Sequence, residues 1–346
     1  QAEDGIRDVE RSRGLGDVYK RQVFPVHNLG AMAGWNTPRY WDIFPEINVA
    51  MFNAYTLSFN RRNILKKLFR SGIHQFLDFD GIAFVDSGGF KVAYENFDPD
   101  PVKILKLQER IGADIASTLD YPISFVKGPE KQSKYIKKTV ANAIKSIKNK
   151  SREDMLLFAS VHASDPTTLK NVLRYLNDVA DFDGFAMGSL MPSRTNYRLL
   201  IDMILAAKTV IRDKPLHVYG LGGPLHVPLL AFLGVDSTDS SSFIICAGNR
   251  RYFVPGYKVV YLQELVKLKE LPCNCPICSN KTVEEIRKDR NLIALHNLWA
   301  LWFELKQVRF AMMRGKLLQY LETRYSDAPF MKIVLEYAKR KIKNLI

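Results

Sequence analysis

Long apolar runs are missing from this sequence. No stretch of the 346 residues approaches the roughly 18 apolar residues that a membrane-spanning helix needs, and no apolar core of a secretory signal is visible. Internal repeats and low-complexity tracts are also missing, although 47% of the residues are hydrophobic. The composition is therefore that of a globular protein with a buried core, and we expect it in the cytoplasm.

Cysteine is scarce, and its distribution argues against a disulfide framework. Three of the four cysteines are Cys273, Cys275 and Cys278, whereas Cys246 lies in an apolar stretch and is interpreted as a core residue. Three thiolates at this short spacing can bind one metal ion. Structural zinc needs a fourth ligand, for which His296 is the best candidate, although a lone histidine among leucines is often a core residue.

Acidic residues are in deficit. The chain has 36 Asp and Glu against 50 Lys and Arg, which gives a formal net charge of +14. A surplus of positive charge in a non-secreted protein favours a polyanionic partner. Seven lysines and no acid lie between Lys131 and Lys150, but apolar residues recur there at helical spacing. A solvated face of an amphipathic helix is favoured for that run over a dedicated binding patch.

Phosphate-loop signatures are absent too. Two glycine-rich stretches, Gly184–Leu190 and Tyr219–Pro224, could bring backbone groups against a flat ligand. Neither follows the GxGxxG pattern, so neither predicts a dinucleotide site.

The sequence does contain a repeated unit, in which a short β-rich apolar run ends in a polar or glycine residue and an amphipathic helical stretch follows. Seven such units at fairly even spacing predict a parallel α/β fold, and at this length a (β/α)8 TIM barrel is favoured over a doubly wound sheet. The candidate eighth strand is Lys258–Leu262. The other predicted strands are Ile47–Phe52, Ile82–Val85, Ile115–Leu119, Leu156–Val161, Gly184–Met187, Leu216–Tyr219 and Val235–Thr238.

Three segments follow from this pattern. Residues 1–22 have no start methionine and no apolar periodicity, so we interpret them as a non-native, adapter-derived extension and expect them to be disordered. Residues 23–270 form the predicted catalytic TIM barrel. Residues 271–346 hold the cysteine cluster and then helical sequence, which predicts a small zinc-binding subdomain and C-terminal helices that complete the barrel.

Aspartates follow several predicted strands. Asp86, Asp120 and Asp239 lie at strand ends and Asp236 lies close to one, and in a barrel all these ends open on the face where active sites lie. Two carboxylates facing one pocket can break a glycosidic bond, one as nucleophile and the other as acid or base. Each aspartate could equally cap the next helix. After Asp86, the pair Gly88-Gly89 forms a turn where backbone NH groups can approach a ligand.

Six stretches, in the right order, carry a resemblance to a known family. They are Asn53–Leu57, Asp86–Phe90, Gly112–Pro122, Gly184–Leu190, Gly234–Asp239 and the cysteine cluster followed by His296–Leu298. Together they resemble the guanine transglycosylase superfamily, whose members exchange guanine for a 7-deazaguanine base in tRNA and which has a branch that acts on DNA. The resemblance runs from about residue 23 to residue 305.

This resemblance implies a role for each matched residue. Asp239 would be the nucleophile that displaces guanine and forms a covalent sugar–enzyme intermediate, and Asp86 would be the general acid/base. Asp120 would pair with the base, and His162 stands where the family usually has glutamine. Zinc would be structural. The remaining base-binding positions would be Ser87, Gly88, Gly188, Ser189 and Leu190.

The chain also departs from the family. Lys91 replaces a glutamine, and residues 240–251 replace a Pro-Thr-Arg loop that helps to hold tRNA. We therefore expect a base-exchanging pentosyltransferase that acts on tRNA, with DNA as a close alternative and with a dimer or an accessory subunit left open.

Two other classes of function were weighed. The first is a non-catalytic nucleic-acid-binding partner subunit, which the presence of both Asp86 and Asp239 disfavours. The second is a metal-dependent hydrolase, which would need histidine ligands at strand ends, and only His162 is placed there.

Overall fold

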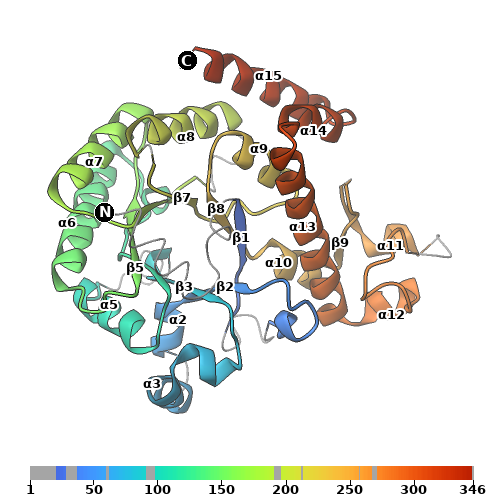
Figure 1. Ribbon diagram of the computed structural model, residues 1–346, viewed down its shortest axis with the longest axis horizontal. Helices are drawn as coiled ribbons and strands as arrows, with labels where there is room; N and C mark the ends of the chain where they lie inside the picture. The colour runs from blue at the N-terminus through green and yellow to red at the C-terminus, as the bar shows by residue number, and fades with distance from the viewer. Residues whose placement is uncertain are drawn as a thin grey trace.

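Parallel strands alternate with helices along most of the chain (Figure 1). The computed structural model describes residues 21–28, 37–59, 62–90, 98–190, 196–211, 213–256, 258–266 and 271–344. The main sheet comprises β1 (Gln22–Pro25), β2 (Val49–Asn53), β3 (Ile82–Asp86), β4 (Ile115–Ser117), β5 (Leu156–Val161), β6 (Gly184–Met187), β7 (Leu216–Val218) and β8 (Ser237–Ser240). Its order is β1-β8-β7-β6-β5-β4-β3-β2 and its neighbours are parallel. A parallel bridge between Val26 and Met51 joins β1 to β2, so the predicted TIM barrel is confirmed.

Helices cover the outside of the barrel (Figure 1). α7 shows why they form: the Asp165 side chain accepts hydrogen bonds from the first backbone NH groups, a proline opens the first turn, and Leu169, Leu173 and Leu176 form one buried stripe. The first eight helices are α2 (Ala54–Phe59), α3 (Arg62–Leu77), α5 (Pro101–Arg110), α6 (Pro129–Asn149), α7 (Pro166–Val179), α8 (Tyr197–Ile211), α9 (His226–Phe232) and α10 (Ser242–Gly248). Short 3-10 helices lie at η1 (Tyr40–Asp42) and η2 (Ile123–Phe125).

The lysine-rich stretch forms α6, and the helix is amphipathic as predicted. It buries Ile136, Thr139 and Ala143 against the barrel. Two of its lysines pair with acids, Lys138 with Asp98 and Lys145 with Asp100. Among the described helices, none combines the length and apolar character that crossing a membrane requires.

Aromatic rings fill one layer of the barrel interior. Phe24, Phe84, Phe158 and His217 come from β1, β3, β5 and β7, so each belongs to an alternate strand, as expected for a packed TIM barrel. The ring centroids of Phe84 lie 5.5 Å from Phe24, 5.7 Å from Phe158 and 4.9 Å from His217, in edge-to-face geometry. This layer is an apolar floor beneath the carboxyl ends of the strands.

The eighth strand differs from the prediction. Val259–Tyr261 is β10, which pairs antiparallel with β9 (Arg251–Phe253) outside the barrel, and the missing barrel strand is β1. β1 is only four residues long and ends in proline, so it carries too little periodicity to be found in the sequence.

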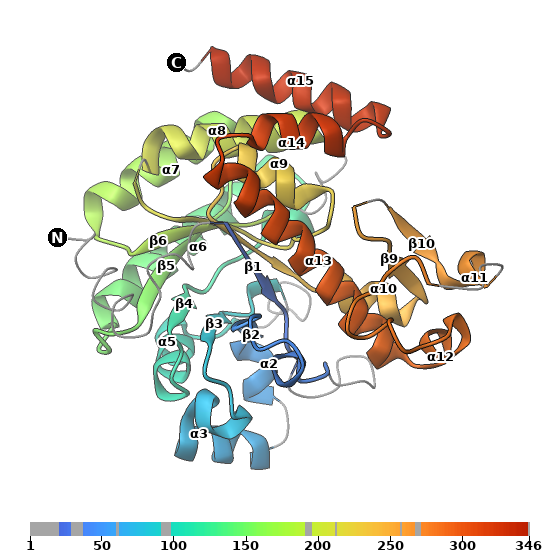
Figure 2. The same cartoon turned by 45° about the vertical axis from the view of Figure 1, so that its right-hand side comes forward.

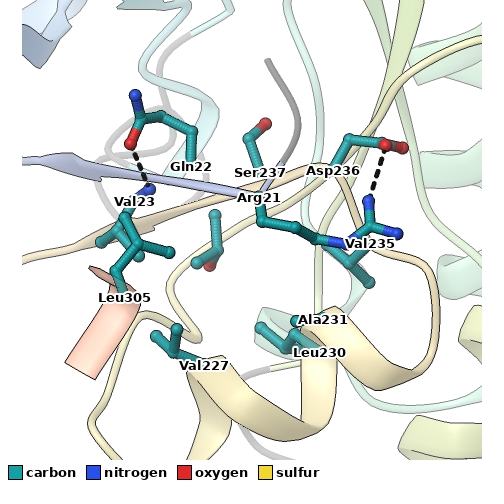
Figure 3. A pocket seen from close by; sticks show the side chains of 11 residues that line it. Arg21, Gln22, Val23, Val227, Leu230, Ala231, Val235, Asp236, Ser237 and Leu305 are labelled. Atoms are coloured by element: carbon teal, nitrogen blue, oxygen red, sulfur yellow. Dashed lines mark hydrogen bonds and ion pairs between the residues drawn. The ribbon is translucent and has the colours of Figure 1, made fainter. Parts of the chain in front are cut away.

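The first described residues belong to the fold rather than to a non-native extension. Arg21 pairs with Asp236 at 2.9 Å (Figure 3), and Arg309 of α13 donates to the Arg21 carbonyl. Gln22 is already part of β1. The boundary therefore lies before Arg21, and residues 1–20 of the predicted extension lie outside the described residues.

The C-terminal part closes the side of the barrel. α10, β9, α11 (Leu262–Leu265) and α12 (Val283–Lys288) gather on one side, next to α13 (Arg290–Met313) (Figures 1 and 2). α13 packs against both α9 and β1, and the buried pair of Glu304 with Arg324 links it to α14 (Leu317–Arg324). α15 (Pro329–Lys343) packs on α8, where the Tyr337 hydroxyl donates to Asp202.

Replacement of Phe24 by Ala is expected to destabilise the protein strongly. The ring is 1% exposed and supports the interior layer, and loss of a buried phenylalanine costs about 3–5 kcal/mol of unfolding free energy. Urea denaturation followed by circular dichroism measures this cost. Phe330→Ala is the control, because that ring is 56% exposed. Equal losses for the two variants would contradict the placement of β1 in the barrel.

Candidate active site and metal centre

Three of the predicted aspartates meet at the carboxyl ends of the strands. Asp86 is the last residue of β3, Asp120 follows β4, and Asp239 lies within β8. Because parallel strands of a barrel end on one face, side chains distant in sequence are brought to one mouth. Asp236 does not join them, since it binds Arg21 and the Leu216 backbone NH near the opposite strand ends.

Asp86 is surrounded by hydrogen-bond donors from neighbouring strands. Its Oδ2 accepts from Asn53 Nδ2 and from the Gly88 NH, each at 3.1 Å, and its Oδ1 accepts from Ser117 Oγ at 3.1 Å. Asn53 is fixed in turn, because its Oδ1 accepts from the Thr56 NH at the start of α2. The carboxylate is thereby held in one orientation at the mouth.

Asp86 is also tuned for proton transfer. Burial, followed by the negative charge of Asp120, raises the pKa of Asp86 from 3.8 to about 7, and Asp239 adds to the rise. Hydrogen bonds from Gly88 and Ser117 act against it. A carboxyl group with this pKa has both protonation states available near neutral pH, which suits a general acid/base.

Asp239 has a different set of donors. Its Oδ1 accepts from the Gly220 NH at 2.7 Å and lies 3.3 Å from His217 Nε2. His217 Nδ1 lies 2.9 Å from Ser237 Oγ, so the imidazole is held from both sides. Two donors aimed at one oxygen stabilise the charged form and fix the direction in which the other oxygen faces.

Sequence reasoning missed His217. It lies inside a predicted strand rather than after it, so it gave no sign of facing the mouth. The only available signal was a single histidine at an inward position of an apolar strand, which is more often a satisfied core residue.

Asp120 pairs with His162 rather than standing free. Asp120 Oδ2 lies 2.7 Å from His162 Nε2, and Asp120 Oδ1 accepts from Ser87 Oγ at 3.2 Å. On the other side of the ring, His162 Nδ1 lies 3.0 Å from Ser189 Oγ. The structure thus joins four of the predicted base-binding residues in one hydrogen-bonded chain.

The glycines at the mouth make room for this chain. A Cβ on Gly89 would lie 1.8 Å from Asp120 Oδ1, and a Cβ on Gly188 would lie 2.4 Å from His162 Cε1. The NH groups of Gly88 and Gly188 are committed inside the protein, to Asp86 and to the Val161 carbonyl. These two predicted base-binding positions therefore do not offer their NH groups to a ligand.

Two other predicted positions and one missed residue complete the mouth. The Leu190 side chain is buried, whereas Phe90 is 56% exposed. Phe90 packs edge-to-face against Phe125 of η2, with ring centroids 4.9 Å apart, and sequence reasoning did not single out Phe125. Lys91 lies outside the described residues.

A second cluster lies in the C-terminal part. The ligand atoms of Cys273, Cys275, Cys278 and His296 all lie within 4.8 Å of one another. His296 Nδ1 faces the sulfurs, because its Nε2 lies 2.8 Å from the Phe253 carbonyl and donates to it. Tyr252 stacks on the imidazole at 3.6 Å.

The chemistry of this cluster fits a metal ion. The donor set is three sulfurs and one imidazole nitrogen, and the hydrogen bond on Nε2 fixes the tautomer, as is usual for metal-bound histidine. Hydrogen bonds from Cys275 and Cys278 hold the pKa of Cys273 well below its usual range, and Cys273 in turn raises the pKa of Cys275 to about 11. A divalent cation would let all three sulfurs ionise together.

Asp86→Asn is expected to stabilise the protein at about pH 8 by roughly 2 kcal/mol, and the gain should vanish near pH 4. Because the folded state raises the pKa of Asp86, it binds the proton more tightly than the unfolded state does. Stability is therefore lost as pH rises from the unfolded pKa through about 7. Asn removes the charge and keeps an acceptor for Asn53.

Thermal unfolding of both proteins across this pH range measures the effect. Asp165→Asn is the control of opposite sign, because hydrogen bonds from Thr168 lower the pKa of Asp165. A stability gain for Asp86→Asn that is independent of pH would show that Asp86 is not the strained group.

Comparison with known proteins adds the family. The family model described as queuine tRNA-ribosyltransferase matches residues 16–329. The tRNA-guanine(15) transglycosylase of Thermococcus onnurineus is 32% identical over 310 residues, which cover 86% of this chain and 52% of that protein. The enzyme of the same name from Pyrococcus abyssi is 30% identical over 292 residues, which cover 82% of this chain and 48% of that protein.

The chain thus spans about half the length of these curated relatives. The family match begins before β1 and extends past α14, so it includes the strands, the aspartates and the Cys3His cluster. This chain belongs to the queuine tRNA-ribosyltransferase family.

Proposed function

We propose that this protein is a pentosyltransferase that exchanges a guanine base in tRNA for a 7-deazaguanine base. The observation that carries the proposal is the pairing, at one barrel mouth, of a carboxyl group with a pKa of about 7 and a second carboxylate held by two donors. Such a pair can divide the cleavage of a glycosidic bond between a proton carrier and a nucleophile.

In the proposed reaction, Asp239 attacks C1′ of the target nucleotide. A bond forms between its carboxylate oxygen and C1′, the bond from C1′ to guanine N9 breaks, and the leaving guanine takes a proton from Asp86. The incoming base then returns a proton to Asp86 and attacks C1′, which releases Asp239. The donors Gly220 and His217 hold Asp239 at the start and accept it back at the end.

Asp120 has a different task in this scheme. It is 5% exposed and its two oxygens already bind Ser87 and His162, each of which uses one lone pair. The remaining lone pairs can accept N–H groups of a base. Its negative charge next to Asp86 also keeps the pKa of Asp86 high, so base recognition and proton transfer are electrostatically linked.

A tRNA substrate is favoured over DNA because the relatives described above are named tRNA-guanine(15) transglycosylases. The net charge of +14 favours a polynucleotide in general and does not separate the two. The target base must be extruded from its stack to reach carboxylates at the strand ends.

We further propose that the Cys3His cluster holds a structural zinc ion. The four ligands come from the segment before α12 and from α13 itself, and α13 also packs on β1. Zinc there would fasten the C-terminal part to the barrel wall.

The test of the reaction is incorporation of labelled guanine into tRNA and into duplex DNA by the same protein. We expect label in tRNA, and a covalent protein–tRNA adduct on a denaturing gel. Asp239→Asn should abolish both signals, because the amide cannot displace the base. Asp236→Asn is the matched control and should keep them, since Asp236 lies away from the mouth. Label in DNA alone would overturn the tRNA substrate, and an adduct in Asp239→Asn would overturn the nucleophile.

The test of the metal is elemental analysis with thermal unfolding. Cys275→Ser should lose zinc and several kcal/mol of stability together, because metal binding and folding are coupled. Cys246→Ser is the control, since that cysteine lies outside the cluster. A Cys275→Ser protein that keeps one equivalent of zinc would contradict the proposed ligand set.

A further inference from the structure

One hydrogen-bonded chain crosses the mouth from β3 to β6. It runs from Ser87 to Asp120 (3.2 Å), from Asp120 to His162 (2.7 Å) and from His162 to Ser189 (3.0 Å). Ser87, Asp120 and His162 are buried, whereas Ser189 is partly exposed. A ligand in the mouth therefore meets the Ser189 end of the chain.

His162 cannot reach a ligand itself. Its side chain is 0% exposed, and both ring nitrogens face protein groups. Gly188 lies directly against the ring, since a Cβ there would come within 2.4 Å of Cε1. Any effect of His162 on a bound base must pass through Asp120 or Ser189.

The chain has a direction, which the chemistry of its groups sets. An ionised Asp120 carboxylate only accepts hydrogen bonds, so His162 Nε2 must donate to it. In a neutral imidazole, Nδ1 is then an acceptor, and the Ser189 hydroxyl spends its single proton on Nδ1. Ser189 Oγ is left with lone pairs only.

We propose that His162 is a positioning residue that fixes the polarity of Ser189, so that Ser189 Oγ accepts a hydrogen bond from an N–H group of the bound base. This inference rests on the proposed function, because it names the base as the ligand. It also changes the role expected for His162, from a base contact to a group that acts through its neighbour.

The backbone at Ser189 supports a fixed role for this hydroxyl. Its φ is +64°, in the left-handed region that non-glycine residues adopt at a cost. Gly188, the preceding residue, is needed against the ring instead. The strained conformation at position 189 places Oγ on Nδ1 of His162.

The tautomer is tested by nitrogen-15 NMR of histidine-labelled protein, which needs no activity. We expect His162 to show one protonated nitrogen and one bare nitrogen, with the proton on Nε2. The six histidines are assigned by loss of one signal pair in His162→Gln. A doubly protonated ring, or a proton on Nδ1, would overturn the proposal, because Ser189 would then be free to donate.

Kinetics test the consequence for the base. Ser189→Ala and His162→Met should each raise KM for guanine about tenfold, as expected for one lost hydrogen bond, with KM for tRNA unchanged. The double variant should be no worse than either single variant, since both changes break one unit. His162→Gln should restore KM for guanine, because the amide can donate to Asp120 and accept from Ser189. Additive losses, or no rescue by glutamine, would overturn the proposal.

His74→Met is the matched control. His74 Nε2 also pairs with an aspartate, Asp114, at 3.0 Å, but Asp114 immediately precedes β4 at the opposite strand ends. This variant should lose stability without a change in KM for guanine. If the wild-type protein exchanges no guanine into tRNA or DNA, the proposed function fails, whereas the NMR result and the guanine affinity from calorimetry still decide the polarity of Ser189.

Discussion

The crowding of three carboxylates above an apolar floor is the constraint on which the site depends. Asp86, Asp120 and Asp239 share one mouth, and beneath them lies a layer of aromatic rings that offers little polar compensation. Charges in such a place must be hydrogen-bonded or neutralised. The protein treats each aspartate differently, and the difference separates their roles: Asp86 tends toward the protonated form, Asp120 is paired with a histidine, and Asp239 is held by two donors.

Strand register supplies the compensating groups. Asn53 lies beside Asp86 because β2 and β3 pair them directly, and His217 lies beside Ser237 through the pairing of β7 with β8. His217 serves two layers, since its ring packs on Phe84 in the floor while its Nε2 reaches Asp239 in the mouth. Closure of the barrel by β1 brings Phe24 under the same histidine, with centroids 6.2 Å apart. Packing of the core and orientation of the nucleophile candidate are therefore one problem.

Much of this arrangement could be predicted from the sequence, and the remainder fails for physical reasons. The barrel and the position of Asp86 follow from apolar runs that stop at polar residues, and the Cys3His cluster follows from ligand spacing. β1 could not be found because four residues show no periodicity. His217 could not be found because an inward strand position does not reveal which atoms lie above it. The sealing of His162 depends on the contact with Gly188, which is set by two loops far apart in sequence.

The same reasoning explains how a histidine can stand where the family usually has glutamine. A glutamine amide presents an N–H donor and a carbonyl acceptor about as far apart as the two edges of an imidazole. A neutral His162 with its proton on Nε2 presents the same pair, with the donor toward Asp120 and the acceptor toward Ser189. The substitution then conserves the direction of the hydrogen-bonded chain while it replaces a flexible side chain by a rigid ring. Rigidity at that position requires glycine at 188, because a side chain there would collide with the ring.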